Sequence, residues 1–157
     1  MSHNHPPRGT PERLRREICR AHALTAELAT AVLDLASARC ALPDRARQAN
    51  RIRELIGAQA WTDAALALVA LDRARIVRQL IRDETEWRCT LESQWLVPDW
   101  LGDTVDFAHP VLPLAILGAL VESWRGSSVA SPAKTSVPGS RSDLRDAIAC
   151  IDCGNFA

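Results

Sequence analysis

Small and apolar side chains recur at alternating steps of four and three residues through the first forty positions, which places them along one side of an α-helix. Thr10, Pro11 and Glu12 are typical of a helix start, because they supply a capping hydroxyl, a proline at the first helical position and an acid at the positive end of the helix dipole. We therefore expect one helix from residue 10 to about Cys40, with a narrow seam of the coiled-coil kind that needs a cover. The seam consists of Leu14, Ile18, Ala21, Thr25, Leu28, Val32 and Leu35.

After a proline, a second amphipathic segment runs from Asp44 to Ile56, and Gly57 is suited to a left-handed C-cap. Together the first two helices predict an antiparallel hairpin arm over residues 10–57. A third helix, apolar enough to be mostly buried, is expected to begin near Trp61 with Thr62 as its cap.

The helical period then gives way to β character. Residues 75–82 are rich in β-branched side chains, and residues 86–93 alternate, with Trp87, Cys89 and Leu91 on one face. A short polar segment separates the two, so we expect a β-hairpin whose Trp87 face rests on helices.

Residues 94–109 show no clear period and predict an irregular loop. Pro110 is expected to start a fourth helix that ends near Arg125, with Pro113 tolerated in its first turn. Apolar residues cover nearly every side of this segment, which predicts the central core helix. We also place Trp87 and Trp124 in the core.

The predicted fold class is α+β and mostly helical. A disordered leader (1–9) precedes the arm, a compact α-β-β-α body covers residues 58–125, and a flexible tail follows over 126–157. The tail contains one possible short helix at 142–151.

Residues 60–124 resemble small bacterial proteins of unknown function, a resemblance that covers less than half of the chain. It is carried by three stretches, Ala60-Trp61-Thr62-Asp63-Ala64-Ala65-Leu66-Ala67-Leu68, Glu86-Trp87-Arg88-Cys89 and Val111-Leu112-Pro113-Leu114-Ala115-Ile116-Leu117. The resemblance implies a single domain and no particular chemistry.

Nineteen basic and nineteen acidic residues cancel over the 157 positions, so no global field recruits nucleic acid or an anionic membrane. The charges are nevertheless unevenly distributed. Residues 1–58 hold ten arginines and six acids, whereas residues 59–125 hold six arginines and ten acids. We expect the two segments to attract each other, within one chain or between two.

The polar N-terminus lacks the apolar region of a signal peptide, and the longest uncharged apolar stretch, 111–121, is too short to span a bilayer. Five cysteines, an odd number, are typical of reduced thiols in a chain of this size. We therefore expect a cytoplasmic protein without a membrane partner.

Two local patterns raise the question of metal or catalytic chemistry. Cys150 and Cys153 form half of a zinc-binding motif, but no second pair completes it, so incidental tail cysteines are favoured and no cofactor is expected. Asp103, Asp106 and His109 could bind a divalent metal or supply an oriented base, but loop hydrogen bonds and helix capping are the favoured explanation.

Two further groups are candidates for binding. The first is a set of arginines on the second helix that could contact phosphates, although a solvated face is the simpler explanation: Arg45, Arg47, Arg51 and Arg53. The second is Trp95 and Trp100, which are the tryptophans best placed for an exposed contact.

The sequence identifies no biochemical activity, since it contains no phosphate loop, dinucleotide fingerprint, zinc-protease motif or nucleophile elbow. We favour a protein-interaction or regulatory adaptor protein over an enzyme, with the seam as the surface for a homodimer. A nucleic-acid-associated regulator using the arginines is one alternative. A small metal-dependent or hydrolytic enzyme using Asp103, Asp106 and His109 is the other.

Overall fold

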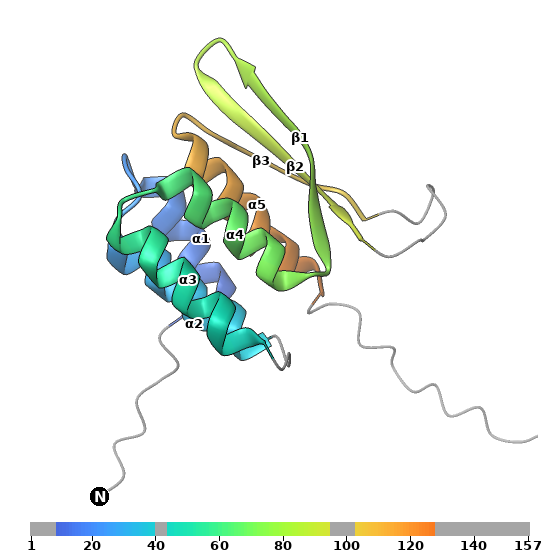
Figure 1. The fold of residues 1–157 in the computed structure, drawn as a ribbon. Coiled ribbons are helices and arrows are strands. Elements are labelled where there is room, and N and C mark those ends of the chain that lie inside the picture. The colour runs from blue at the N-terminus through green and yellow to red at the C-terminus, as the bar shows by residue number, and fades with distance from the viewer. Residues whose placement is uncertain (1–8, 40–43, 95–102, 128–157) are drawn as a thin grey trace, which may run out of the picture.

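The computed structural model describes residues 9–39, 44–94 and 103–127. Its elements, in chain order, are α1 (Pro11–Arg20), α2 (Ala26–Arg39), α3 (Arg45–Gly57), α4 (Trp61–Asp72), β1 (Arg75–Asp83), β2 (Glu86–Ser93), β3 (Val105–His109) and α5 (Leu112–Ser127). The strands form an antiparallel sheet in the order β1-β2-β3, and the helices gather on one side of it (Figure 1). The predicted class, α+β and mostly helical, is confirmed.

Helix α5 forms the centre of the core, as its apolar sequence predicts. Side chains from Leu114 to Leu117 and from Ala119 to Val121 are fully buried. Helices α1 and α4 pack on α5 from one direction, and strands β2 and β3 cover it from another. Trp124 is buried as expected, whereas Trp87 is only half-buried and lies at the edge of the core.

The prediction of one helix from residue 10 to residue 40 is wrong. Thr10 caps the start of α1 as expected. The helix ends at Arg20, however, and Ala21 after it has extended backbone, with φ −75° and ψ 135°. The long rod is therefore two shorter helices joined by a bend.

Thr25 provides the physical reason for this bend. Its hydroxyl oxygen accepts a hydrogen bond from the backbone N–H of Leu28 at 3.3 Å, and its carbonyl accepts one from Ala29. These are the contacts of an N-cap, so the residue that weakens the seam starts a new helix instead. The connecting segment also buries Leu24, which helps to hold the bend against the core.

Three helix ends differ from their predicted details. Gly57 lies inside α3, and the left-handed backbone expected there occurs two residues later, at Gln59 with φ 57°. Helix α4 has Ala60 at its N-cap position, so Thr62 lies within the first turn and does not cap it. Helix α5 begins at Leu112 and not at Pro110.

The predicted β-hairpin is confirmed and contains one irregularity. Strands β1 and β2 pair from Arg75 opposite Ser93 to Asp83 opposite Glu86. The register shifts between Val77 and Gln79, which leaves Arg78 as an extra residue in β1, a β-bulge. The turn of this hairpin projects beyond the ends of the helices (Figure 1).

The prediction of an irregular loop is wrong for its last residues, because 105–109 form the strand β3 beside β2. The alternation of larger and smaller or charged side chains supports this pairing, since Phe107 and His109 face the same side as the buried Cys89. This side, toward α5, is here called the inner face. The opposite side, with Asp106 and Ala108, is called the outer face, and no helix that the structure describes covers it (Figure 1).

Phe107 lies directly on Gly118 of α5. A Cβ atom added at this glycine would come within 2.2 Å of the phenyl ring. The missing side chain therefore allows the sheet to approach the helix closely.

We expect Gly118→Ala to lower the free energy of unfolding by about 1–3 kcal/mol, because overpacking outweighs the helix propensity of about 1 kcal/mol that alanine adds. Gly57→Ala is the matched control, since nothing lies within 4 Å of the added Cβ there, and it should leave stability unchanged or increase it. Urea denaturation of both variants measures the effect. Equal stability of Gly118→Ala and the wild type would contradict this packing.

Candidate functional site

The seam predicted for partner contact belongs to the core of the single chain. Four of its members are buried in that core, two more pack at its edge, and Thr25 is exposed as the cap of α2. The buried members are Leu14, Ile18, Leu28 and Val32, and those at the edge are Ala21 and Leu35. A homodimer along this seam therefore loses its basis, because the fold already covers the apolar stripe.

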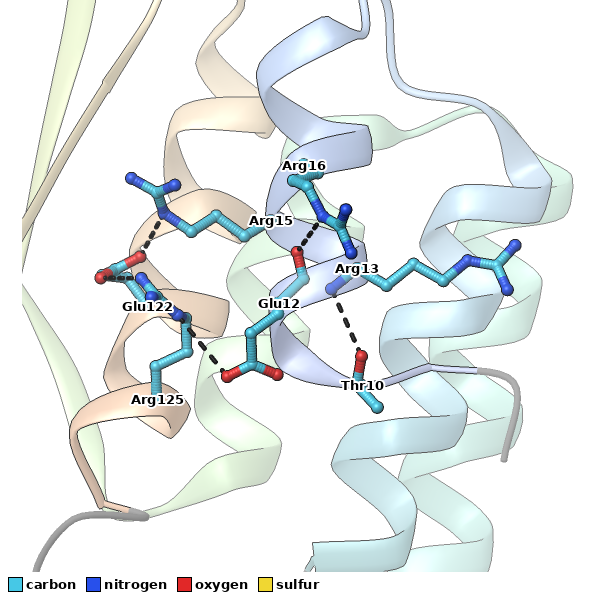
Figure 2. Close-up of polar contacts among 7 residues, drawn as sticks. All are labelled: Thr10, Glu12, Arg13, Arg15, Arg16, Glu122 and Arg125. Carbon is cyan, nitrogen blue, oxygen red and sulfur yellow. Dashed lines mark hydrogen bonds and ion pairs between the residues drawn. The ribbon is translucent and has the colours of Figure 1, made fainter. Parts of the chain in front are cut away.

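The predicted arm is also not separate from the body, because ion pairs join α1 to α5 (Figure 2). Arg15 Nε lies 2.6 Å from a carboxylate oxygen of Glu122, and Arg125 contacts the second oxygen of Glu122 at 2.6 Å. Arg125 also lies 3.8 Å from Glu12. The hydrogen bond to Glu122 raises the pKa of Arg125 above its usual value. The basic first segment and the acidic middle thus attract each other within one chain.

The arginines of α3 do not form one continuous binding face. Arg47 and Arg51 are exposed and lie one helical turn apart, so they share a side of the helix. In the described part of the chain neither makes an ion pair. Arg53 instead donates to the side chain of Asn50 at 3.0 Å, and Arg45 is half-buried. Two of the four predicted arginines therefore remain as a candidate phosphate contact.

Asp103, Asp106 and His109 are not brought together. Asp103 accepts hydrogen bonds from Arg75, with 2.7 Å between the guanidinium and the carboxylate. Asp106 accepts from the hydroxyl of Thr90, which is its neighbour on the outer face.

His109 points to the inner face, is 7% exposed and accepts the backbone N–H of Val111 through Nδ1 at 3.0 Å. These contacts are local backbone and ion-pair contacts. They do not form the metal or base arrangement that the spacing suggested.

His109 also lines a cleft of about 330 Å³ together with Cys19, His22 and Glu86. These side chains are chemically suited to bind a metal. Within the residues that the structure describes, however, no three His, Cys, Asp or Glu side chains are grouped closely enough to hold one. The cleft is a surface depression between the end of α1 and the sheet, lined by both polar and apolar side chains.

A second groove of about 640 Å³ lies between α1 and α2. Its rim carries the carboxylates of Glu17, Glu27 and Asp34, and Arg13 pairs with Glu17 at 2.8 Å. The groove is therefore acidic and open.

A charged cluster lies where α4 meets the sheet. Burial raises the pKa of the Asp72 carboxyl, an effect that the Trp124 indole and the guanidinium groups of Arg39 and Arg75 partly oppose. Arg39 also lies over the Trp124 ring, 5.5 Å from its centroid. Arg75 is itself 7% exposed and paired with Asp103, so it links the start of β1 to the segment that precedes β3.

The remaining predicted candidates lie outside the described residues. They are Trp95 and Trp100 of the expected contact loop, Cys150 and Cys153 of the expected tail, and the short helix predicted at 142–151.

Strand β1 carries the main exposed apolar surface. Ile76 and Ile81 are each 43% exposed, and Leu80 is 37% exposed. These three residues are here called the β1 surface. Among the described residues the only other large hydrophobic side chain with comparable exposure is Leu66 on α4. A signal for this surface is present in the sequence, because paired apolar residues at 76–77 and 80–81 place apolar side chains on both faces of a strand, and only one face can rest on the core.

β1 is also an edge strand. It pairs with β2 along one edge, and no strand within the described ranges pairs with the other edge. An exposed edge presents unpaired backbone N–H and C=O groups, to which another polypeptide can add a strand. Exposed apolar side chains and free backbone groups thus coincide on one element.

Comparison of the chain with family models, curated proteins and solved structures found no match in any of the three. In the part of the chain that the structure covers, no helix has the length and apolar content needed to cross a bilayer.

The two described thiols differ strongly in environment, which gives a test of the sheet packing. Cys19 is exposed, whereas Cys89 is buried on the inner face. Burial, and to a lesser extent the nearby Asp106 carboxylate, raises the pKa of Cys89 from 9.0 to about 11. The neutral thiol is therefore favoured in the folded state, so its contribution to stability is complete below pH 9 and is lost as the pH rises through 11.

We expect the wild type to lose about 2 kcal/mol of unfolding free energy between pH 8 and pH 11 through this one group. The chain has no tyrosine and one lysine, so apart from the other thiols and the N-terminal amine few groups titrate in that range. Cys89→Ala should be less stable overall and show a flatter pH dependence, whereas Cys19→Ala should keep the wild-type slope. Identical slopes in the two variants would show that Cys89 is not the titrating group.

Proposed function

We propose that the protein acts by protein–protein interaction and that β1 supplies the contact. The observation that carries this proposal is the gathering of Ile76, Leu80 and Ile81 on one strand whose second edge pairs with no described strand. The class of function is the one that the sequence favours. The surface is different, because the seam is used inside the fold.

The mechanism is the addition of an extended polypeptide segment to the sheet. The partner's backbone pairs with the open edge of β1, and its side chains cover Ile76 and Ile81 on the outer face. Backbone hydrogen bonds supply affinity that depends little on sequence, whereas the apolar contacts select partners with apolar side chains at matching positions. Nine residues, Arg75–Asp83, are available for this pairing.

A photoreactive amino acid placed at position 81 tests this proposal. Under illumination in lysate of the native host, we expect it to form a covalent link to a polypeptide, identified by mass spectrometry of the linked peptides. The same residue placed at position 46, where Ala46 is exposed on α3, is the matched control and should form no such link. Equal linking at both positions, or none at position 81, overturns the proposal.

A second function, contact with nucleic acid, is supported by one observation. Arg47 and Arg51 are exposed on one side of α3 and lack ion-pair partners in the described part of the chain. Guanidinium groups so placed can contact successive phosphates. The neutral overall charge makes any such binding depend on this local pair.

An electrophoretic mobility assay at low salt tests this second function. We expect Arg47→Ala/Arg51→Ala to bind RNA or DNA less tightly and to reduce the slope of log affinity against log salt by about 2, one for each phosphate contact. Arg20→Ala, an exposed arginine of α1, serves as the control and should bind like the wild type. If the wild type shifts neither RNA nor DNA, this function is excluded.

A further inference from the structure

We propose that the polypeptide added to β1 is a second copy of this chain, antiparallel to the first and related to it by a two-fold axis between Arg78 and Gln79. This inference rests on the proposed protein-interaction function and specifies its partner. It is carried by the order of side chains along β1 and by the position of the bulge.

The central part of β1 reads the same in both directions in terms of polarity. Two apolar residues, Ile76 and Val77, precede two polar ones, and two apolar residues, Leu80 and Ile81, follow. An antiparallel copy centred between the polar residues places Ile76 opposite Ile81 of the second copy. It also places Val77 opposite Leu80 of the second copy. Every exposed apolar side chain of β1 then meets another.

In a regular strand this arrangement would fail. Residues opposite each other in an antiparallel pair point to the same face, but positions 76 and 81 are five positions apart, an odd step, and in a regular strand they would point to opposite faces. The bulge removes this conflict. Ile76 pairs with Glu92 and Ile81 pairs with Arg88, and these partners are four residues apart on the regular strand β2. Ile76 and Ile81 therefore share the outer face.

The second apolar pair is matched in the same way. Val77 pairs with Leu91 and Leu80 pairs with Cys89, two residues apart on β2, so both point to the inner face. The extra residue Arg78 thus makes the faces of β1 symmetric about its centre. A second copy carries its own extra residue, so that Arg78 of each copy lies opposite Gln79 of the other and no further offset is needed, whereas a regular strand would leave one position unpaired at the bulge.

Charge along β1 supports the antiparallel direction. Arg73 lies just before the strand, and Asp83 and Glu84 lie at its far end, so two antiparallel copies bring a basic start beside an acidic end, twice. Arg75 faces Arg82 of the second copy in this register. Their guanidinium groups already have partners, because Arg75 is bonded to Asp103 and Arg82 lies over the Trp87 ring, 5.6 Å from its centroid.

The result is a continuous sheet of six strands in the order β3-β2-β1-β1-β2-β3, counting the described strands of both copies. A two-fold axis perpendicular to the sheet keeps the helices of both copies on the same side, and the outer face becomes one surface twice as wide. Ile76 and Ile81 of each copy, 43% exposed in the single chain, form two apolar contacts across the axis.

Sedimentation velocity of the purified full chain at tens of micromolar tests whether the dimer forms. Charged substitutions at positions 76 and 81 test the register of the two β1 strands. We expect the wild type to be a dimer. Ile76→Glu and Ile81→Lys should each raise the dimer dissociation constant by about a hundredfold, because each dimer would contain two isolated charges against isoleucine. The double variant Ile76→Glu/Ile81→Lys should restore the dimer, because opposite charges then meet on both sides of the axis.

Leu66→Lys is the control, since it adds the same charge at an equally exposed apolar residue outside β1 and should remain a dimer. Circular dichroism confirms that every variant is folded, and both substituted positions on β1 lie away from the core. A monomeric wild type overturns the second copy as partner, while the photolinking result at position 81 still decides the proposed function. A dimer that survives both single substitutions, or one that the double variant does not restore, overturns this register.

Discussion

Residues 112–121 of helix α5 are apolar on every side, and the need to cover them determines how α1, α4, β2 and β3 are arranged. Strands β2 and β3 cover one side, and α1 and α4 cover others. Removing apolar surface from water is the main favourable contribution to folding, so a helix segment that is apolar on every side requires neighbours from distant parts of the sequence. The bend at Thr25 divides the predicted rod so that α1 packs on α5 while α2 packs on α3 and α4.

The elements that could be predicted from the sequence are those with a strong local signal. The apolar run of α5, the alternation of β2 and the cap at Thr10 each indicate one structure without reference to the rest of the chain. The bend between α1 and α2 could not be predicted in this way, because the four-and-three spacing continues through Thr25 while the backbone does not. The spacing correctly predicts that residues such as Leu14 and Val32 are buried. It does not predict which part of the protein covers them.

The candidate site residues also show that spacing along the chain does not determine which side chains meet in the fold. Asp103, Asp106 and His109 are evenly spaced, but Asp106 and His109 lie three apart on β3 and point to opposite faces, and the prediction of a loop over 94–109 missed this strand. The bulge in β1 cannot be predicted from the pattern of polar and apolar residues. It becomes visible only when β1 and β2 are paired, because only then does Arg78 lack a partner position. The exposed apolar surface of β1, in contrast, can be predicted from the sequence, because the apolar pairs at 76–77 and 80–81 place apolar side chains on both faces of the strand.

The position of α5 in the chain has a consequence for synthesis. The helix that α1, α4, β2 and β3 contact is also the last described element to leave the ribosome. While residues up to Pro110 are being made, α1 and α4 can pack on α2 and α3, but the surfaces of α1, α4 and the sheet that pack on α5 are still exposed, and a nascent chain exposes such surfaces to aggregation. The core of the domain is therefore complete only when α5 has been made.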